Sequence, residues 1–360
     1  MMKKVLFTLA VALMVFMLTA QKFSSEPKTD GISGATKPMA KDGNSLFHKT
    51  DEVKLKPGTL AILGEVQKPG KVDFDKLYKR EIFVKEATYS QTAGIDLIGA
   101  YRYSGYSLFD ILNSFNLQKK NSEIFPPAID LYLIIENSAG ESVVFSWSEI
   151  FHVNNPHQVI IATEMAPIVP YRKEVNYAMG DTWKVVASND LFAYRVLVDP
   201  VKITVRSFDS KEYLIDRDVK AMSNPEVNVY LNDVLVQTIN PFAENTKFIR
   251  YYSSFYGMGM GYHPAKYFQG PSLVGLLENT IDLFDASFIR NGLVCFAGAD
   301  GYRTIFSFSE LFNRTDQVFP IFSVPDNNES QEGSRIFHPA EFYADRSVKL
   351  LSEMYIFQHK

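Results

Sequence analysis

The residues best suited to covalent chemistry lie near the N-terminus of this 360-residue chain, in the heptapeptide Asp30-Gly-Ile-Ser-Gly-Ala-Thr36. The hydroxyl of Thr36 is a nucleophile once a base removes its proton, and it can form a phosphoester bond. Gly34 and Ala35 add little bulk beside it, and glycine adopts backbone angles that other residues avoid. The segment is therefore suited to lie extended in the active site of a modifying enzyme.

The heptapeptide resembles the motif D-x-x-S/T-G-A-T/S, at which extracytoplasmic flavin transferases attach FMN to a threonine or serine hydroxyl. The resemblance implies a covalent FMN on Thr36 and a flavin transferase as a partner. The remaining residues of the implied cofactor site are Asp30, Ser33, Gly34 and Ala35. The sequence departs from the motif at Pro38, where a second hydroxyl residue is common. The alternative interpretation is a solvated linker rich in Ser, Gly and Thr.

The first 20 residues have the features of a secretory signal peptide. Lys3 and Lys4 precede an apolar run from Val5 to Leu18, which is too short to span a bilayer comfortably. We predict cleavage after Ala20 and export to the periplasm, where flavin transferases of this kind work. The alternative is an uncleaved N-terminal anchor in the inner membrane. No later stretch is apolar for long enough to cross a membrane, so we expect no transmembrane segment in the mature chain.

Composition narrows the remaining function classes. The formal net charge of −4 argues against nucleic acid as a partner. The 28 Phe and 19 Tyr residues favour strands and a β-rich globular protein. The only cysteine, Cys295, lies in an apolar run, and we interpret it as a buried, unreactive thiol.

The order of the sequence indicates a linker followed by two related domains. Residues 21–58 are polar and without periodicity, which predicts a flexible linker around the motif at 30–36. Three later pairs of segments match in the same order. They are Tyr103–Leu112 with Phe268–Leu277, Gly140–Phe151 with Gly301–Phe312, and Trp183–Val205 with Ser334–Ile356. We infer a tandem duplication and define a first repeat, residues 59–208, and a second repeat, residues 226–358.

Each repeat is predicted to alternate hairpins with short helices. Ser107 has the type of an N-cap residue, and Leu108, Ile111, Leu112 and Phe115 follow at helical spacing. Residues 129–135 and 142–145 read as two strands joined by a turn. The resulting fold class is α+β, with a mixed sheet in each of the two domains.

This order of elements is similar to the molybdopterin-binding domain of the sulfite oxidase superfamily. The resemblance rests on Tyr103-Ser-Gly-Tyr-Ser-Leu and Ala299-Asp-Gly-Tyr-Arg-Thr-Ile-Phe-Ser-Phe-Ser-Glu-Leu. The closing segments Lys184-Val-Val-Ala-Ser-Asn-Asp and Arg335-Ile-Phe-His-Pro-Ala-Glu add to it, since each continues through an arginine into a last strand. It implies two tandem domains of this mixed-sheet type and, in the family, a cysteine thiolate on molybdenum.

The corresponding segments of this chain contain no such cysteine. Residues 87–100 of the first repeat and 255–266 of the second lack one, and Cys295 lies too far along the chain. A soft thiolate suits that metal, and serine or methionine would replace it badly. We therefore expect neither molybdopterin nor molybdenum catalysis, and no metal site.

Other candidate residues have modest interpretations. The six histidines are scattered, which favours surface or structural roles. Gly257-Met-Gly-Met-Gly261 and its tyrosine neighbours predict a surface loop, with a flat aromatic pocket for a flavin or pterin as the alternative. Glu149 and Glu310, which match in the two repeats, are interpreted either as solvated helix residues or as acids in an N-terminal helical turn, where a negative charge favours the helix dipole. We assign no catalytic residue.

Two hypotheses follow. The first is an exported redox or electron-transfer protein that carries FMN on Thr36 and has a membrane or periplasmic redox partner; any enzyme activity would be that of an oxidoreductase. The second is a non-enzymatic binding or scaffold protein outside the cytoplasm, built on the same duplicated domains.

Overall fold

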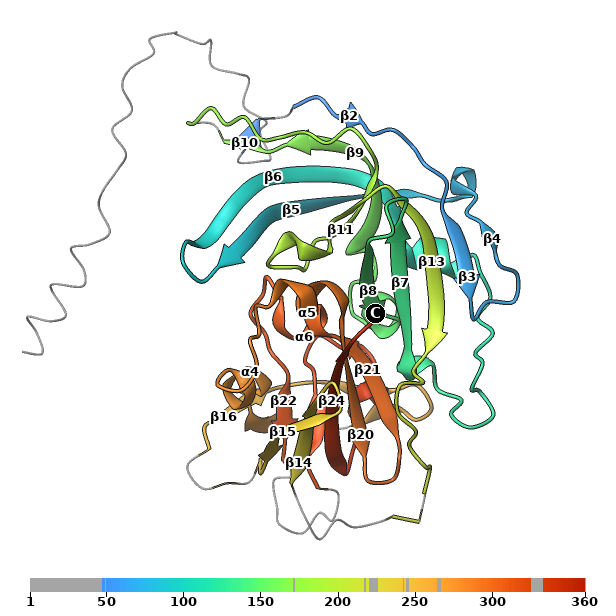
Figure 1. Cartoon of the computed structure of the whole chain (residues 1–360), viewed down its shortest axis with the longest axis vertical. Helices are drawn as coiled ribbons and strands as arrows, with labels where there is room; N and C mark the ends of the chain where they lie inside the picture. Colours follow the sequence, from blue (N-terminus) through green and yellow to red (C-terminus); the bar gives the residue numbers. More distant parts are fainter. Residues whose placement is uncertain are drawn as a thin grey trace, which may run out of the picture. The chain divides into compact units, whose positions relative to one another are not determined.

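The computed structural model describes residues 47–48, 50–170, 172–216, 218–219, 226–241, 243, 246–263, 267–324 and 333–359 (Figure 1). All of these residues belong to one compact unit, Lys41–Lys360. The predicted signal peptide, residues 1–20, and the motif at 30–36 lie outside the described residues.

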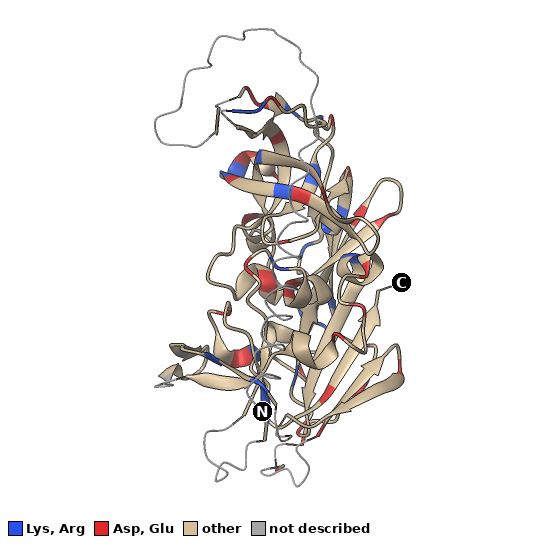
Figure 2. Cartoon of the chain, turned by 90° about the vertical axis from the view of Figure 1, so that its left-hand side faces the viewer, with Lys and Arg blue, Asp and Glu red and all other residues tan. Residues whose placement is uncertain are grey.

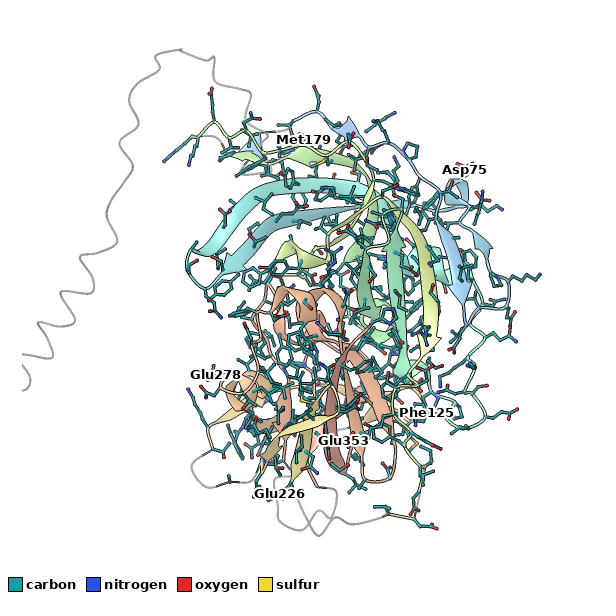
Figure 3. All side chains as sticks on the ribbon, viewed as in Figure 1. Asp75, Phe125, Met179, Glu226, Glu278 and Glu353 are labelled. Atoms are coloured by element: carbon teal, nitrogen blue, oxygen red, sulfur yellow. The ribbon has the colours of Figure 1, made fainter. Side chains whose placement is uncertain are left out.

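Two sheets form the first repeat. One sheet has the order β4-β3-β13-β7-β8, and its strands are β3 (Ala61–Gly64), β4 (Gly70–Lys71), β7 (Leu131–Asn137), β8 (Ser142–Ser146) and β13 (Pro200–Ser207). The other has the order β12-β11-β9-β6-β5, from β5 (Lys79–Ser90), β6 (Gly94–Ser107), β9 (Val159–Pro167), β11 (Lys184–Ala187) and β12 (Leu197–Val198). Side chains fill the space between these two sheets (Figure 3).

The second repeat has one sheet of the same size and several smaller ones. Its five strands have the order β15-β14-β24-β20-β21 and are β14 (Val227–Leu231), β15 (Val234–Ile239), β20 (Gly292–Gly298), β21 (Arg303–Ser307) and β24 (Leu351–Gln358). Three short pairs accompany it: β16 (Phe248–Tyr251) with β19 (Phe268–Pro271), β17 (Phe255–Gly257) with β18 (Gly261–His263), and β22 (Ile321–Ser323) with β23 (Arg335–Phe337).

The two five-stranded sheets match strand for strand. β3 pairs parallel with β13, and β14 pairs parallel with β24, whereas every other pairing in both sheets is antiparallel. The hairpins after β7 and β20 contain Gly140 and Gly301, both with a positive φ. Asp199 and Leu350, which occupy matching positions before the last strand of each sheet, also share a positive φ. The two repeats therefore match in the backbone conformation of single residues as well as in strand order.

The predicted α+β class is wrong, because the structure is β-rich. Strands account for 46% of it and helices for 13%. The described α-helices contain four to six residues: α2 (Leu108–Asn113), α3 (Ser148–Phe151), α4 (Leu273–Leu277), α5 (Ala286–Asn291) and α6 (Phe308–Phe312). The 3₁₀ turns are η1 (Phe74–Lys76), η2 (Ala128–Asp130), η3 (Ala193–Arg195) and η4 (Ala344–Arg346). The helical spacing was correct locally, but each run ends within two turns and cannot form a helical layer.

The helix predicted after Ser107 is confirmed as α2. The Ser107 hydroxyl accepts a hydrogen bond from the Asp110 amide at 3.1 Å, which satisfies one of the free N–H groups of the first turn. Leu108, Ile111 and Leu112 are buried against the sheets of the first repeat.

Folded structure begins earlier than the predicted linker end at residue 58. β1 (Phe47–His48) pairs with β10 (Val169–Pro170), and β2 (Val53–Lys54) pairs with β9. Leu55 follows β2 and is only 4% exposed. Residues 51–58 are exposed except for Leu55, so their polar composition gave no indication of this buried residue.

Both faces of the central strands are buried. Along β7, Leu133 packs into the core of the first repeat, whereas its neighbours Tyr132 and Ile134 face the second repeat. On β20, Cys295 lies in that same shared cluster, and Phe296 packs into the core of the second repeat. Because side chains alternate along a strand, these two apolar runs join the two five-stranded sheets face to face.

None of the described helices has the length and apolar character needed to span a bilayer. Basic and acidic positions are interspersed over the described chain (Figure 2).

Candidate functional site

Two buried arginines occupy matching positions in the repeats. Arg195 and Arg346 end the 3₁₀ turns η3 and η4, and each is 2% exposed. The guanidinium of Arg195 lies 4.0 Å from the centre of the Phe145 ring, and that of Arg346 lies 3.4 Å from the Phe306 ring. The aromatic faces stabilise both cations in the interior.

Each arginine binds a glutamate in the first turn of a short helix. Arg195 Nη1 donates to Glu149 Oε1 at 3.1 Å, and Arg346 Nη2 donates to Glu310 Oε1 at 2.8 Å. Glu149 also accepts from the Ser146 amide, and Glu310 accepts from the amide of Ser307, the N-cap residue of α6, both at 2.7 Å.

The interpretation as solvated residues is therefore wrong for both glutamates, which are 6% and 7% exposed. The alternative interpretation, an acid in the N-terminal turn of a helix, is confirmed for both. The serine hydroxyls in turn accept from the amides of Glu149 and Glu310 at 3.0 Å. At α6 this completes a capping box, and Ser146 and Glu149 make the same reciprocal pair of bonds next to α3. These bonds turn each carboxylate back toward its serine, on the side that faces the buried contact between the repeats.

A second acid completes each arginine site, and here the repeats differ. Asp190 accepts from Nε and Nη2 of Arg195 at 2.8 and 2.6 Å, a two-pronged pair. The matching residue, Glu341, accepts from Arg346 through Nη1 alone, at 2.9 Å. Glu341 Oε2 and Arg346 Nε are buried without a hydrogen-bond partner.

The two arginine sites meet at the junction of the repeats, where the contacts are reciprocal. The Leu191 amide donates to the Asn313 carbonyl, and the Phe342 amide donates to the His152 carbonyl, both at 2.9 Å. Arg195 Nη1 also donates to the Ser307 hydroxyl at 3.2 Å, so the first arginine contacts the capping box of the second repeat. Figure 1 shows α6 on the side of the second repeat that faces the first.

Burial controls ionisation in this cluster. It raises the pKa of Glu149 to about 8 and that of Glu341 to about 8, despite the neighbouring arginines. Burial also lowers the pKa of His152 to about 4 and holds the pKa of His338 well below its ordinary value. Near neutral pH the junction therefore contains protonated carboxyls and neutral imidazoles beside permanently charged arginines.

A pH dependence of stability follows from these shifts. Between pH 6.5 and 8 the folded protein keeps protons on Glu149 and Glu341 that the unfolded chain has released, so the stability of the folded state falls as the pH rises. Below about pH 6.5 the two histidines oppose this trend, because the unfolded chain then binds protons that His152 and His338 exclude when folded. Melting temperatures measured across this window should fall for the wild type and fall less steeply for Glu341→Gln. A flat wild-type profile would contradict the buried, protonated carboxyls.

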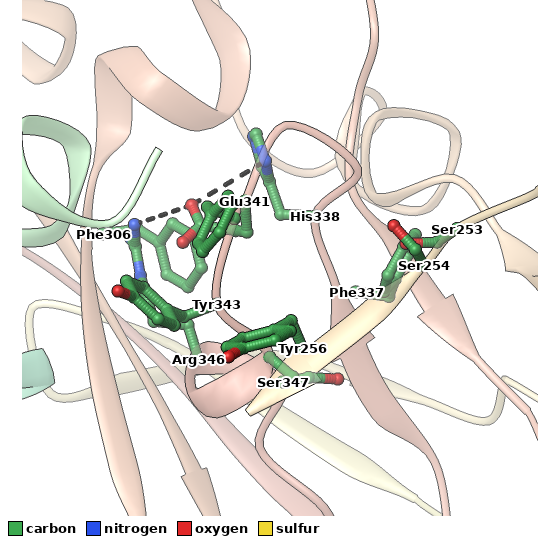
Figure 4. A pocket seen from close by; sticks show the side chains of 12 residues that line it. Ser253, Ser254, Tyr256, Phe306, Phe337, His338, Glu341, Tyr343, Arg346 and Ser347 are labelled. Carbon is green, nitrogen blue, oxygen red and sulfur yellow. Dashed lines mark hydrogen bonds and ion pairs between the residues drawn. The ribbon is translucent and has the colours of Figure 1, made fainter. Parts of the chain in front are cut away.

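A narrow recess opens beside Arg346 in the second repeat (Figure 4). Glu341 lies between Arg346 and His338, with its Oε1 4.0 Å from His338 Nδ1. The recess has room for about 20 Å³. Apart from Ala344, the other lining residues are aromatic or carry hydroxyls: Ser253, Ser254, Tyr256, Phe306, Phe337, Phe342, Tyr343 and Ser347.

The glycine-rich segment forms the hairpin β17–β18. Its Met258 amide donates to Asp345 Oδ2 at 2.8 Å, while the Met258 and Met260 side chains are 45% and 80% exposed. Gly257, Gly259 and Met260 line a cleft of about 370 Å³ together with Tyr302, Arg335 and Lys349. The hairpin β17–β18 is therefore exposed at the surface and also lines a cleft.

The sole cysteine does not fit a metal centre. Cys295 is a free thiol buried on β20, and burial raises its pKa, which opposes formation of the thiolate that a soft metal requires. In the described part of the chain, no three His, Cys, Asp or Glu side chains gather to hold a metal ion. We derive no chemistry from molybdopterin.

Three of the described histidines have separate side-chain partners. His152 Nδ1 contacts the Ser148 hydroxyl at 2.9 Å, His157 Nδ1 contacts the Ser107 hydroxyl at 3.0 Å, and His338 Nε2 lies 3.3 Å from Arg314 Nη1. The sequence-predicted cofactor residues Asp30, Ser33, Gly34, Ala35 and Thr36 lie outside the described residues.

No family model and no curated protein matches this chain in sequence. The fold and the arginine sites therefore define the class by themselves: a β-rich protein of two matching repeats joined through a buried ionic junction.

The sequence contained a usable signal for that junction. Asp190 and Arg195 match Glu341 and Arg346 when the closing segments of the repeats are aligned. An acid and a base that recur at matching positions before a last strand indicate a shared structural pair, but their burial depends on how the repeats pack.

Proposed function

We propose that this protein is an exported electron-transfer protein that carries FMN covalently on Thr36. The observation that carries the proposal is the heptapeptide Asp30–Thr36, together with the signal-like N-terminus that would take it to a flavin transferase. Flavin, once attached, would supply the one- and two-electron chemistry. Any enzyme activity would be an oxidoreductase activity, and the partners would be the transferase and a membrane or periplasmic redox protein.

The attachment step balances for a flavin dinucleotide donor. The Thr36 oxygen would attack the FMN phosphorus, the pyrophosphate bond would break, and AMP would leave. The hydroxyl proton would pass to a base of the transferase. No electrons are transferred in this step.

The folded repeats support a carrier rather than a second redox centre. The Cys295 thiol is buried, and the acids of the junction are held in ion pairs or capping boxes. We assign them structural roles.

The test is the intact mass and denaturing-gel fluorescence of the exported protein, produced with and without an active flavin transferase. We expect an FMN adduct that requires the transferase and is completely lost in Thr36→Ala. Ser33→Ala is an informative second variant, because it changes a motif residue but leaves the acceptor hydroxyl. An unmodified wild-type chain beside a transferase that modifies a known substrate would overturn the proposal.

That outcome would favour the second function, a non-enzymatic binding or scaffold protein. The specific observation in its favour is the cleft of about 370 Å³ at hairpin β17–β18, beside the exposed Met258 and Met260. Exposed methionines adapt to varied partners. Loss of partner capture in a Met258→Ala, Met260→Ala double variant would support it.

A further inference from the structure

Strand β5 of the first repeat has a free edge. It is the last strand in the order β12-β11-β9-β6-β5 and pairs with β6 alone (Figure 1). Among the described residues, the backbone of residues 79–87 forms no hydrogen bond outside that pairing. The first additional bond comes at Tyr89, whose N–H donates to the Tyr194 hydroxyl at 3.0 Å. The unpaired N–H and C=O groups of such an edge are a template for another strand.

The side chains of β5 alternate between the interior and the solvent. Ile82 and Val84 point into the core of the first repeat and are 9% and 6% exposed. On the other face, Glu81 and Lys85 are exposed, and Phe83 between them is 49% exposed. The solvent face of this edge therefore presents an acid, an aromatic ring and a base at alternate positions.

Neighbouring residues leave part of this face unsatisfied. Glu81 Oε2 lies 3.5 Å from Arg102 Nε, and its side chain is still 45% exposed. The Phe47 ring contacts Phe83 edge-on, with the ring centres 5.7 Å apart. Lys85 has no ion pair among the described residues. The face can therefore accept an acid opposite Lys85 and an apolar group beside Phe83.

The segment from Arg80 to Glu86 is complementary to its own reverse. An antiparallel pair of two such segments, centred on Phe83, brings unlike charges or apolar side chains together at every position: Arg80 with Glu86, Glu81 with Lys85, Ile82 with Val84, and Phe83 with itself. Unlike charges directly opposite each other stabilise a strand pair, and like charges destabilise it.

Neighbouring registers lose this match. A centre between Ile82 and Phe83 places Arg80 opposite Lys85, and a centre on Ile82 places Glu81 opposite Phe83. The ladder between β5 and β6 is also regular up to Glu86, where its register shifts. The regular part of the edge thus ends where the complementary segment ends.

Exposed apolar side chains extend this surface at both ends of β5. Tyr78, directly before the strand, is 78% exposed. Leu97, which lies opposite Ala87 on β6, is 51% exposed. Because the two strands are antiparallel, Tyr78 of one copy comes beside the Leu97 end of the hairpin in the other. Contact between these ends removes apolar surface from water.

We propose that the edge of β5 binds a second copy of this chain, through antiparallel pairing of residues 80–86 about a two-fold axis at Phe83. The pairing satisfies the free backbone groups of both edges and joins the two sheets into one. It forms two ion pairs between Glu81 and Lys85, one on each side of the axis. The interface lies in the first repeat and is independent of flavin on Thr36.

Sedimentation equilibrium of the exported protein tests the proposal, because it measures the mass of the particle at several concentrations. We expect a reversible dimer. A mass of one chain at every concentration up to the solubility limit would overturn the proposal. The lysines of β5 would then act to protect the edge from pairing.

Charge reversal tests the register. Lys85→Glu places an acid opposite Glu81 of the second copy. Since the symmetry repeats this change on both sides of the axis, we expect the dissociation constant of the dimer to rise about tenfold or more. Glu81→Lys combined with Lys85→Glu exchanges the two charges and should restore most of the dimer, which a variant with a damaged fold could not do.

Lys68→Glu is the matched control. It makes the same change of charge at an exposed residue between β3 and β4, away from β5, and should leave the dissociation constant unchanged. Equal dimerisation of the wild type and Lys85→Glu would show that another surface joins the copies and would overturn the proposal. Failure of the double variant to recover the dimer would contradict the register centred on Phe83.

Discussion

Replacing Arg195 by methionine is expected to destabilise the protein by about 3–5 kcal/mol, because it removes one partner from a buried ionic cluster. Asp190 loses both of its charge-assisted hydrogen bonds, and Glu149 loses the hydrogen-bond donor that its two carboxyl oxygens share. The Ser307 hydroxyl of the other repeat also loses a donor. Methionine fills much of the volume of the arginine side chain. The loss of stability should therefore come from the acids that lose their hydrogen-bond donor rather than from a cavity. Denaturant unfolding followed by circular dichroism measures it.

The matched control is Arg206→Met, which makes the same substitution in an exposed pair. Arg206 lies 3.2 Å from Asp209, and both side chains are largely solvated. Its loss should change the free energy of unfolding by less than about 1 kcal/mol. Equal effects at Arg195 and Arg206 would show that the ionic junction contributes no more than a surface ion pair.

The second large effect is expected from Gly270→Ala. A Cβ at this position would lie 1.8 Å from the carbonyl oxygen of Phe322, so the backbones of β19 and β22 would have to separate. The matching Gly105 has the same constraint, with the Ile161 carbonyl oxygen at 2.0 Å. We expect a loss of about 3 kcal/mol or more, because overlap with a backbone atom cannot be relieved by a rotamer change.

Gly275→Ala supplies the opposite expectation. Gly275 is exposed within α4, and no atom lies within 4 Å of a Cβ added there. Alanine favours the helix, so this variant should gain up to about 1 kcal/mol. Chemical denaturation of both variants under one condition provides the comparison, and a tolerated Gly270→Ala would contradict the close approach of the two strands.

Local patterns predicted local structure well. Ser107 caps α2 as its type and the following apolar spacing indicated, and the hairpin predicted from residues 129–135 and 142–145 corresponds to β7 and β8. Both depend on neighbours in the sequence. The α+β class was wrong because helical spacing over one or two turns says nothing about how little of the chain the helices occupy.

Burial at the junction of the repeats could not be predicted from such patterns. Glu149 has the sequence position of a solvated acid in a first helical turn. In the structure Arg195, which is distant in the sequence, donates to Glu149 and also to the Ser307 hydroxyl of the other repeat. Likewise, the polar stretch before β3 gave no sign that Leu55 is buried. These features depend on which surfaces the folded repeats bring together.

The reciprocal contacts between the repeats have the geometry of an isologous homodimer whose subunits are joined in one chain. In a homodimer, every substitution appears on both sides of the symmetry axis. Covalent linkage removes that constraint, so each half can change alone. The acid that closes the arginine site could therefore lengthen from aspartate to glutamate on one side while the other side kept the contacts that hold the halves together.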